Sequence, residues 1–315
     1  MYKLIRKIRG ATRRMKDLLF LEDKVADLNE RLDRLVTALG RIEARQTLAL
    51  DASAGLAERE FRAFSQFGDD GIAHHLTRTV PIGNKTFVEF GVENFSEANC
   101  RFLMENDNWR GLVVDSSSRH IAHIKAQMYH WRHDLTAVRA MITRENINDL
   151  CRDSGFTGRI GLLSIDIDGN DYWVWEAMDV VDPAIVVVEY NHRFGPERAV
   201  AVPYDPAFLR SEAHHSGIYY GASLNALCQL GGRKGYAFVG CNSAVNNAWF
   251  VKRSLKPDVI PELTAAEGFV AGRFREARDE RGDLAFLRPE EELRILDGLP
   301  LHEFDCPAPD TDRGV

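Results

Sequence analysis

The chain has 315 residues, 45% of them hydrophobic and 28% charged, a composition typical of a globular protein with one large or two small domains. No apolar run reaches the roughly 18 to 20 residues that a membrane-spanning helix needs. The formal net charge is -7, yet residues 1–16 hold seven basic side chains and no acid. The remainder is therefore acidic, which argues against a globally basic nucleic-acid-binding domain, and we expect no nucleic-acid partner.

The five cysteines are scattered and show no CxxC spacing. This pattern is typical of a reduced compartment and argues against a disulfide framework or a zinc site. The N-terminus lacks the uninterrupted apolar core of a secretory signal. We therefore expect a cytoplasmic protein.

Residues 1–19 have apolar side chains at helical spacing with the basic residues mostly between them, which predicts a basic amphipathic helix. Two interpretations fit this pattern. The helix adsorbs to the anionic inner face of the cell membrane, as a peripheral contact. Alternatively, it is a solvated helix that only extends the element after it.

Residues 20–50 predict a coiled coil of about three heptads. Their apolar residues follow a strict rhythm of four and three: Leu21, Val25, Leu28, Leu32, Leu35, Leu39 and Ile42. Such a stripe predicts self-association with another copy, and the alternative is that it packs back on its own globular domain. Gly40 and the small polar residues that follow indicate a linker, assigned to residues 51–58.

Residues 59–300 alternate between strand and helix patterns. Short apolar runs predict strands at 86–90, 111–114, 160–165 and 184–188, with a weaker one at 131–135. Helices are predicted at 96–106, with Ser96 as N-cap, at 116–129 and at 145–154. The runs 236–241 and 248–252 predict an antiparallel hairpin. The expected fold is an α/β doubly wound domain, and residues 301–315 are predicted to be a disordered tail.

The stretch 160–191 reads as strand, acidic turn, short helix and strand, which predicts a parallel βαβ unit. Parallel neighbours bring their carboxyl ends to one edge of the sheet, where ligands bind in open α/β sheets. The polar residues placed there are Asp166, Asp168, Asn170, Asp171, Glu189 and Asn191. So many carboxylates require a cation, a proton or a cationic substrate centre.

The first two strands end in acids, Glu89 and Asp115. An acid at the end of the second strand is placed to bind both ribose hydroxyls of a nucleoside cofactor. The loop at Gly91 lacks the glycine-rich fingerprint, and Glu89 and Glu93 would repel a pyrophosphate. S-adenosylmethionine, with its sulfonium and ammonium groups, therefore fits better than NAD. The alternative is that Glu89 and Asp115 only cap loops.

The carboxylates after the central strand allow two chemistries. One is a hard cation, Mg²⁺ or Mn²⁺, bound by carboxylate oxygens together with Asn191. The other is metal-free, with Asp168 or His192 as the general base. A calcium loop is excluded, because its sixth and twelfth positions would be Asp171 and Ala177. Asp171 itself is predicted to be a helix N-cap.

Two other patterns carry less information. The adjacent pairs at 74–75 and 214–215 are histidines that diverge by about 100° on a helix, so we treat neither as a metal site. Tyr219 and Tyr220 either line the substrate crevice or form a packed pair before the next helix.

Several of these segments together resemble bacterial class I methyltransferase-like proteins of the FkbM type. They are SQFGDDGI at 65–72, FVEFGV at 87–92, WRGL at 109–112, LSIDIDGNDYW at 163–173, VEYN at 188–191 and YGASL at 220–224. The resemblance spans residues 60–290 and implies a Rossmann-like, mostly parallel sheet of seven strands with an antiparallel last strand. It also implies methylation of sugars in surface polysaccharides.

The resemblance implies a site for S-adenosylmethionine at the loop from Glu89 to Gly91 and at Asp115, and we assign the cofactor to Gln66, Glu89, Gly91, Asp115, Ser116 and Asp166. The assigned catalytic residues are Asp168 and His192. A more distant similarity to metal-dependent macrolide-sugar O-methyltransferases implies metal ligation by Asp166 or Asp168, Glu189 and Asn191.

The expected function is an S-adenosylmethionine-dependent O-methyltransferase acting on a sugar hydroxyl, with a free or lipid-linked glycan as acceptor. A second hypothesis is a non-catalytic scaffold that keeps the fold and oligomerises through its coiled coil. A third is a metal-dependent sugar hydroxylase or nucleotidyl enzyme that uses the same carboxylates.

Overall fold

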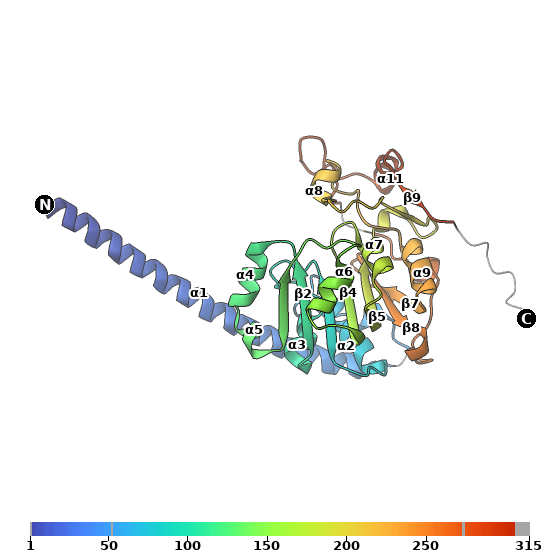
Figure 1. The fold of residues 1–315 in the computed structure, drawn as a ribbon, viewed down its shortest axis with the longest axis horizontal. Coiled ribbons are helices and arrows are strands. Elements are labelled where there is room, and N and C mark those ends of the chain that lie inside the picture. The colour runs from blue at the N-terminus through green and yellow to red at the C-terminus, as the bar shows by residue number, and fades with distance from the viewer. Residues whose placement is uncertain (1, 52, 273–274, 306–315) are drawn as a thin grey trace, which may run out of the picture.

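The computed structural model describes residues 2–51, 53–272 and 275–305, with side chains in the first helix described from Phe20 onward except at 22, 23 and 26. Figure 1 shows a twisted sheet at the centre of a globular body, helices around it, and one long helix that projects away. The main sheet contains β1 (Thr86–Phe90), β2 (Arg110–Asp115), β3 (Leu135–Arg139), β4 (Gly158–Ile165), β5 (Val181–Glu189), β7 (Tyr236–Cys241) and β8 (Asn247–Lys252).

The strands follow the order β3-β2-β1-β4-β5-β8-β7. All neighbouring pairs are parallel except those of β8, which runs antiparallel to β5 and to β7. The order reverses between β1 and β4, and such a switch point opens a crevice at the carboxyl ends of the strands. This is a Rossmann-like, mostly parallel sheet of seven strands, and it confirms the predicted α/β fold class and the antiparallel hairpin.

The sheet is buried on both faces because its strands are runs of β-branched and aliphatic residues. One face packs against α2 (Asp69–Thr79), α3 (Arg101–Asp107), α4 (Ser118–Ala126) and α5 (Met128–Arg132). The other face packs against α6 (Ile147–Asp153), α7 (Asp171–Ala177) and α9 (Leu224–Arg233). The core is therefore two apolar layers separated by the sheet.

A third group of segments covers the carboxyl edge of the sheet. It comprises residues 191–222 and 275–305, and we call it the cap. Its regular elements are η2 (His192–Phe194), β6 (Val200–Ala201), α8 (Arg210–Ala213), α11 (Pro289–Asp297) and β9 (His302–Glu303). Two more short elements, η3 (Arg253–Leu255) and α10 (Ala265–Gly268), follow β8. The cap has an apolar cluster of its own, which includes Phe194, Ile218 and Leu296. In Figure 1, α8, α11 and β9 lie together above the sheet.

The first part of the predicted disordered tail is ordered, because β9 pairs with β6 through Glu303 opposite Val200 and His302 opposite Ala201. The rest of that prediction, at 306–315, lies outside the described residues.

The two N-terminal segments predicted at 1–19 and 20–50 form one continuous helix, α1 (Tyr2–Leu48). Gly40 lies inside α1 and does not begin a linker. A Cβ built on it would come 2.6 Å from the ring of Phe102, so a glycine is what lets α1 pack closely against α3. The basic face predicted for residues 1–19 depends on side chains outside the described part, and membrane adsorption stays a prediction.

The segment predicted as a linker at 51–58 is held in place. Its end forms η1 (Leu56–Arg59), and the Arg59 side chain is buried. The guanidinium donates to the backbone carbonyls of Thr47 (3.2 Å), Asp51 (2.7 Å) and Ala54 (3.3 Å). Carbonyl groups in the last turn of a helix lack helical partners. Arg59 bonds to one of them, at Thr47, and to two more in the loop that follows α1. The end of α1 is thereby fastened to the globular body.

Two predicted boundaries differ from the structure for local reasons. The helix expected from Ser96 begins at Arg101, because Glu93 and Phe95 have positive φ and hold residues 92–100 in a loop. The strand expected at 131–135 instead occupies Leu135–Arg139, since Met128–Arg132 forms α5.

Among the described residues, no helix combines the length and apolar character that crossing a membrane requires.

We expect Arg59→Met to lower the free energy of unfolding by about 2 kcal/mol, because three hydrogen bonds from a buried charged donor are lost. Urea denaturation measures the change. Arg62→Met is the matched control, because Arg62 makes only an exposed ion pair with Glu97 and its loss costs less than about 1 kcal/mol. Equal effects of the two substitutions would contradict the role of Arg59.

Candidate functional site

A cavity of about 800 Å³ opens at the carboxyl ends of β1, β2, β4 and β5, beneath the cap. Eight of the residues assigned from the sequence line it: Gln66, Glu89, Gly91, Asp115, Ser116, Asp166, Asp168 and Glu189. Two assigned residues, Asn191 and His192, are not among its lining residues. The structure therefore brings both predicted halves of the site, the nucleoside half and the carboxylate half, to one crevice.

Asp115 is the last residue of β2 and is held in one position by the loops around it. Its carboxylate accepts hydrogen bonds from the backbone N–H of Glu93 at 2.9 Å and of Ser117 at 2.7 Å, with His120 Nδ1 at 3.2 Å. A carboxylate has about four acceptor positions, so these bonds leave capacity for a ribose hydroxyl. Capping the loops and facing the cavity are thus properties of the same side chain.

Gly91 joins the two halves of the cavity. Its φ is +74°, and a Cβ built there would lie 1.5 Å from the carbonyl oxygen of Asp166. Only glycine allows this backbone conformation and this approach together. The loop after β1 can therefore lie directly against the end of β4.

Glu89 is engaged mainly in holding the loop before α3. Its two oxygens accept from the backbone N–H of Asn99 at 2.6 Å and of Cys100 at 3.2 Å. Burial raises the pKa of Glu89 to about 7. The alternative that Glu89 caps a loop therefore accounts for both of its carboxylate oxygens, and the residue also lines the cavity.

The SQFGDDG segment places Gln66 at the cavity through two buried aspartates. Asp70 Oδ2 accepts from the backbone N–H groups of Ala63, Phe64 and Ser65, each at 2.7 Å. Asp69 accepts from Asn242 Nδ2 at 2.9 Å and Trp249 Nε1 at 3.2 Å. Burial raises the pKa of each aspartate to about 6. This loop is fixed to the start of α2 and to the β7–β8 hairpin.

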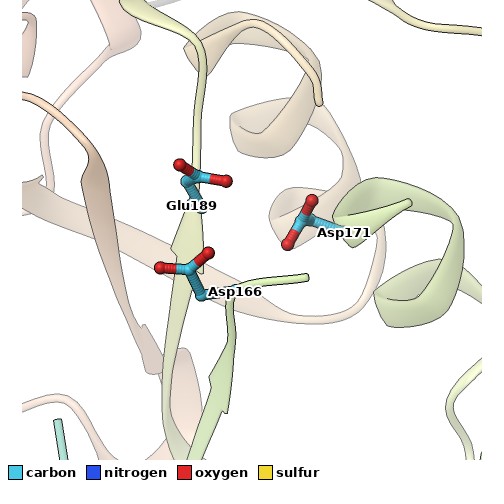
Figure 2. Close-up of side chains that lie close together, drawn as sticks. All are labelled: Asp166, Asp171 and Glu189. Atoms are coloured by element: carbon cyan, nitrogen blue, oxygen red, sulfur yellow. The ribbon is translucent and has the colours of Figure 1, made fainter. Parts of the chain in front are cut away.

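Three carboxylates converge at the centre of the crevice, from the ends of β4 and β5 and the start of α7. Figure 2 shows Asp166 and Glu189 on neighbouring strands, with Asp171 directed toward them from the helix. One ligand atom of each lies within 4.8 Å of those of the other two. Asp171 is fixed by the backbone N–H of Ile167 at 2.8 Å and of Gly169 at 2.9 Å. We call these three residues the carboxylate cluster.

The N-cap prediction for Asp171 was wrong by one position. Asn170 is the N-cap of α7 and Asp171 is the first helical residue. The Asp171 carboxylate turns back to the loop before the helix, and this is what brings it to the carboxylate cluster.

The carboxylate cluster has unfavourable electrostatics when all three groups are ionised. Burial, followed by repulsion from Asp171 and Asp168, holds the pKa of Asp166 well above its usual range. Burial and then repulsion from Asp166 do the same for Glu189. Burial raises the pKa of Asp171 to about 6. A bound cation or retained protons would relieve this repulsion.

The cluster fits a hard divalent cation. Glu189 is 6% exposed, and its Oε2 is buried without a hydrogen-bond partner. A buried polar atom without a partner is costly, and a metal ion would satisfy it. All the ligand atoms are carboxylate oxygens, which Mg²⁺ and Mn²⁺ prefer. The residues present would therefore hold such an ion.

The assignment of Asp168 to the metal requires correction. Asp168 has a φ of +58°, its side chain is 60% exposed, and its carboxylate pairs with Arg210 Nη1 at 2.8 Å. Arg210 also pairs with Glu276 at 3.0 Å and lies over the ring of Tyr220 at 3.7 Å. The left-handed turn thus directs Asp168 toward the cap. Of the two alternatives Asp166 and Asp168, only Asp166 belongs to the group of carboxylates that could hold a metal ion, with Asp171 and Glu189.

Asn191 and His192 are committed to the cap. The buried amide of Asn191 donates to the carbonyls of Ile218 at 2.9 Å and Tyr220 at 3.1 Å, and its Oδ1 accepts from the backbone N–H of Arg193 at 3.2 Å. These bonds engage both polar atoms of the Asn191 amide within the cap. His192 packs against Gly272, and burial lowers the pKa of its imidazole to about 4. The structure gives His192 no access to the cavity as a general base.

Several residues of the cavity wall had no signal in the sequence. They come from the cap: Phe208, Arg210, His214, His215, Glu276 and Arg278. The cap consists of short irregular segments without periodicity, so nothing in the sequence indicated that they face the crevice. Tyr219 and Tyr220 are buried and are not among the lining residues, which agrees with the interpretation that they are packed before the next helix.

No protein-family model matches the sequence. No curated protein matches it either. Solved structures with a similar fold include an O-methyltransferase from Bacillus cereus in complex with SAH, at 12% identity, covering 67% of this chain and 90% of that one, with a TM-score of 0.36. Another is TrmK of M. capricolum in complex with S-adenosyl-homocysteine, at 8% identity, 62% and 74% coverage and a TM-score of 0.34. Similarities this low carry no argument about what this chain binds.

We expect the free energy of unfolding in EDTA to fall as the pH rises from 6 to 8. Because the carboxyl pKa values are raised by folding, the folded state binds more protons than the unfolded state from about pH 4 to 7 and above. The stability that comes from these bound protons is lost when the groups deprotonate at higher pH. Glu189→Gln removes one of these groups and should make the decline shallower by at least about 1.4 kcal/mol, the equivalent of one pKa unit.

Urea midpoints across this pH range measure the effect, and Asp179→Asn, at an exposed residue, is the control. Identical pH profiles for Glu189→Gln and the wild type would contradict a buried, repelling carboxylate cluster.

Proposed function

We propose that the chain is an S-adenosylmethionine-dependent O-methyltransferase of the FkbM type that acts on a sugar hydroxyl. The observation that carries the proposal is the shared cavity. Asp115 and Gly91 line one part of it and the carboxylate cluster lines another, under one cap. Its volume of about 800 Å³ lies within the range of small-molecule and cofactor sites.

The charge of the cavity supports this cofactor over a dinucleotide. Eight carboxylate residues line the cavity, against two arginines: Glu89, Glu93, Glu97, Asp115, Asp166, Asp168, Glu189 and Glu276, with Arg210 and Arg278. A pyrophosphate would be repelled from such a surface, whereas a sulfonium and an ammonium group would be attracted. The loop after β1 also has no second glycine to let a pyrophosphate approach the backbone.

In the proposed reaction the oxygen of a sugar hydroxyl attacks the methyl carbon of the sulfonium. The carbon–sulfur bond breaks, its electron pair stays on sulfur to give S-adenosylhomocysteine, and the hydroxyl proton passes to a base. Asp168 is the proposed proton acceptor, because it lines the cavity and Arg210 fixes its carboxylate. Asp115 holds the ribose, and the cap excludes water from the transfer.

A divalent cation bound by the carboxylate cluster would lower the pKa of a hydroxyl that it contacts. The chain's own contribution is to fix the three carboxylates before substrate arrives, through the backbone bonds to Asp171 and the strands that carry Asp166 and Glu189. A sugar presents neighbouring hydroxyls that suit such a site, and this supports a sugar as the acceptor. The surface polysaccharide as its source rests on the sequence resemblance.

A second candidate function is a non-catalytic scaffold. The observation that favours it is the row of exposed leucines on α1, which is suited to assembly. Buried acids around a cavity, one of them with an oxygen lacking a partner, have no purpose in a pure scaffold and favour the enzyme.

Two substitutions separate cofactor binding from chemistry. We expect Asp115→Asn to weaken binding of S-adenosylhomocysteine by 10- to 100-fold, about 1.5 to 3 kcal/mol, because charge-assisted bonds to the ribose are lost. Asp168→Asn should bind it within about threefold of the wild type and yet lower methyl transfer by about 10² to 10⁴, the usual contribution of a general base.

Calorimetry with S-adenosylhomocysteine measures the first effect. Mass spectrometry of the surface glycan from cells that carry each variant measures the second, with Asp179→Asn as a control for the loss of one surface carboxylate. Absence of binding by the wild type at millimolar ligand would sink the cofactor assignment. Full glycan methylation with Asp168→Asn would remove Asp168 as the base.

A further inference from the structure

Helix α1 has two distinct faces, and only one of them is used by the globular body. Thr37, Gly40, Ala44 and Thr47 are buried, at spacings of three and four residues, against the body formed by α2 and α3. Arg101, itself 4% exposed, pairs with Asp33 at 2.6 Å and fixes the same face. The alternative that the heptad stripe packs back on its own domain is therefore wrong, because a different face makes that contact.

The heptad stripe is the exposed face. Its apolar side chains are between 49% and 62% exposed: Leu21, Val25, Leu28, Leu32, Leu35, Leu39 and Ile42. Isolated exposed leucines are common on protein surfaces, but seven in one strict row are not. In Figure 1 the first part of α1 stands free of the globular body.

The two faces have a fixed relation in the heptad. With Val25, Leu32 and Leu39 at the first core position, a, and Leu21, Leu28, Leu35 and Ile42 at the second, d, the buried residues Thr37 and Gly40 occupy f and b. Those positions lie on the side of a coiled-coil helix away from its partner. The globular body reaches one edge of the seam at Val36, which packs against the cluster of Phe61 and Phe102. The a and d side chains themselves stay exposed and accessible to a second helix.

We propose that α1 pairs with α1 of a second copy of this chain as a parallel coiled coil. The charges on the two edges of the seam support this orientation. One edge, position g, carries Lys24, Arg31 and Arg45, and the other, position e, carries Asn29, Val36 and Glu43. Parallel helices pair edge g with edge e, which has no basic residue.

An antiparallel arrangement would instead place edge g of one helix against edge g of the other, and edge e against edge e. In the register that overlaps the whole stripe, Lys24 lies beside Arg45 of the second copy, and Arg45 beside its Lys24. Like charges placed opposite each other are unfavourable and act against the wrong pairing.

The charge balance also favours a second copy over a membrane as the occupant. Residues 20–48 contain six acidic and five basic side chains, so this part of α1 has no net attraction to an anionic surface. Several of the charges are paired along the helix, as in Arg31 with Asp27 at 2.9 Å and Arg34 with Glu30 at 2.6 Å. A short coiled coil has only marginal stability when its helices must form during association. Here the contact with the globular body orders part of α1 before a second copy binds, which lowers the cost of association.

Parallel pairing has a consequence for the first residues of the chain. It brings residues 1–16 of both copies, with seven basic side chains each, to the same end of the assembly. An assembly of two copies would then contact an anionic surface through two such segments instead of one.

Mass measured by light scattering on the full chain tests the association. We expect the wild type to have a mass of at least twice 35.6 kDa, and Leu28→Asp with Leu35→Asp to reduce it to 35.6 kDa. The matched control is Asp27→Asn with Arg34→Gln, exposed residues off the seam, which should leave the mass of the assembly unchanged. Urea midpoints within error of the wild type show that each variant folds. A monomeric wild type overturns the proposal.

Orientation is tested with one cysteine introduced at the seam, in a Cys228→Ser, Cys306→Ser background that leaves the buried Cys100, Cys151 and Cys241. In a parallel coiled coil the two copies of position 21 face each other, so Leu21→Cys should cross-link to a covalent dimer when diamide oxidises the two thiols to a disulfide. Arg34→Cys, on the outer side, should stay uncrosslinked. Failure of Leu21→Cys to cross-link in an oligomeric protein overturns the parallel orientation.

Discussion

The structure depends on one constraint, which is that parallel strands deliver all their carboxyl ends to the same edge. Four strands of this chain end there in or beside an acid, and no basic side chain follows directly to neutralise it. Backbone N–H groups stabilise part of this charge by donating hydrogen bonds to Glu89, Asp115 and Asp171. At Asp166 and Glu189 they do not, and the pKa values of both rise. That remaining imbalance is the physical basis of the proposed site.

The cap turns this edge into an enclosed site. Arg210 links Asp168 to Glu276, and Arg193 links Glu276 to Glu292 of α11 at 3.1 Å on each side. A chain of ion pairs thus runs from the cavity to the outermost helix of the cap. Partly buried ion pairs of this kind position groups more than they stabilise a fold. In the proposed reaction they would fix the acceptor side of the crevice, while the nucleoside side is fixed by the sheet.

The sheet and most of the cavity floor could be predicted from the sequence. Runs of apolar residues indicate the strands, and the polar residues at the ends of these runs indicate the cavity floor. Asp115 and Glu189 could be placed at one rim without coordinates for this reason. The direction of the Asp168 side chain could not, since its left-handed φ of +58° turns it toward Arg210 and away from the carboxylate cluster. Arg210 and Glu276 lie in segments without periodicity, and only tertiary packing brings them over the strands. The face that α1 presents to its own domain was hidden because Thr37, Gly40 and Ala44 make no apolar pattern.

The most direct test of the account is a crystal structure of the full chain grown with S-adenosylhomocysteine and Mn²⁺. We expect the ribose at Asp115, the adenosyl group along the loop after Gly91, and an anomalous manganese peak between Asp166, Asp171 and Glu189. A ligand bound away from the carboxyl edge of the sheet, or manganese bound elsewhere with the carboxylate cluster bare, would contradict it.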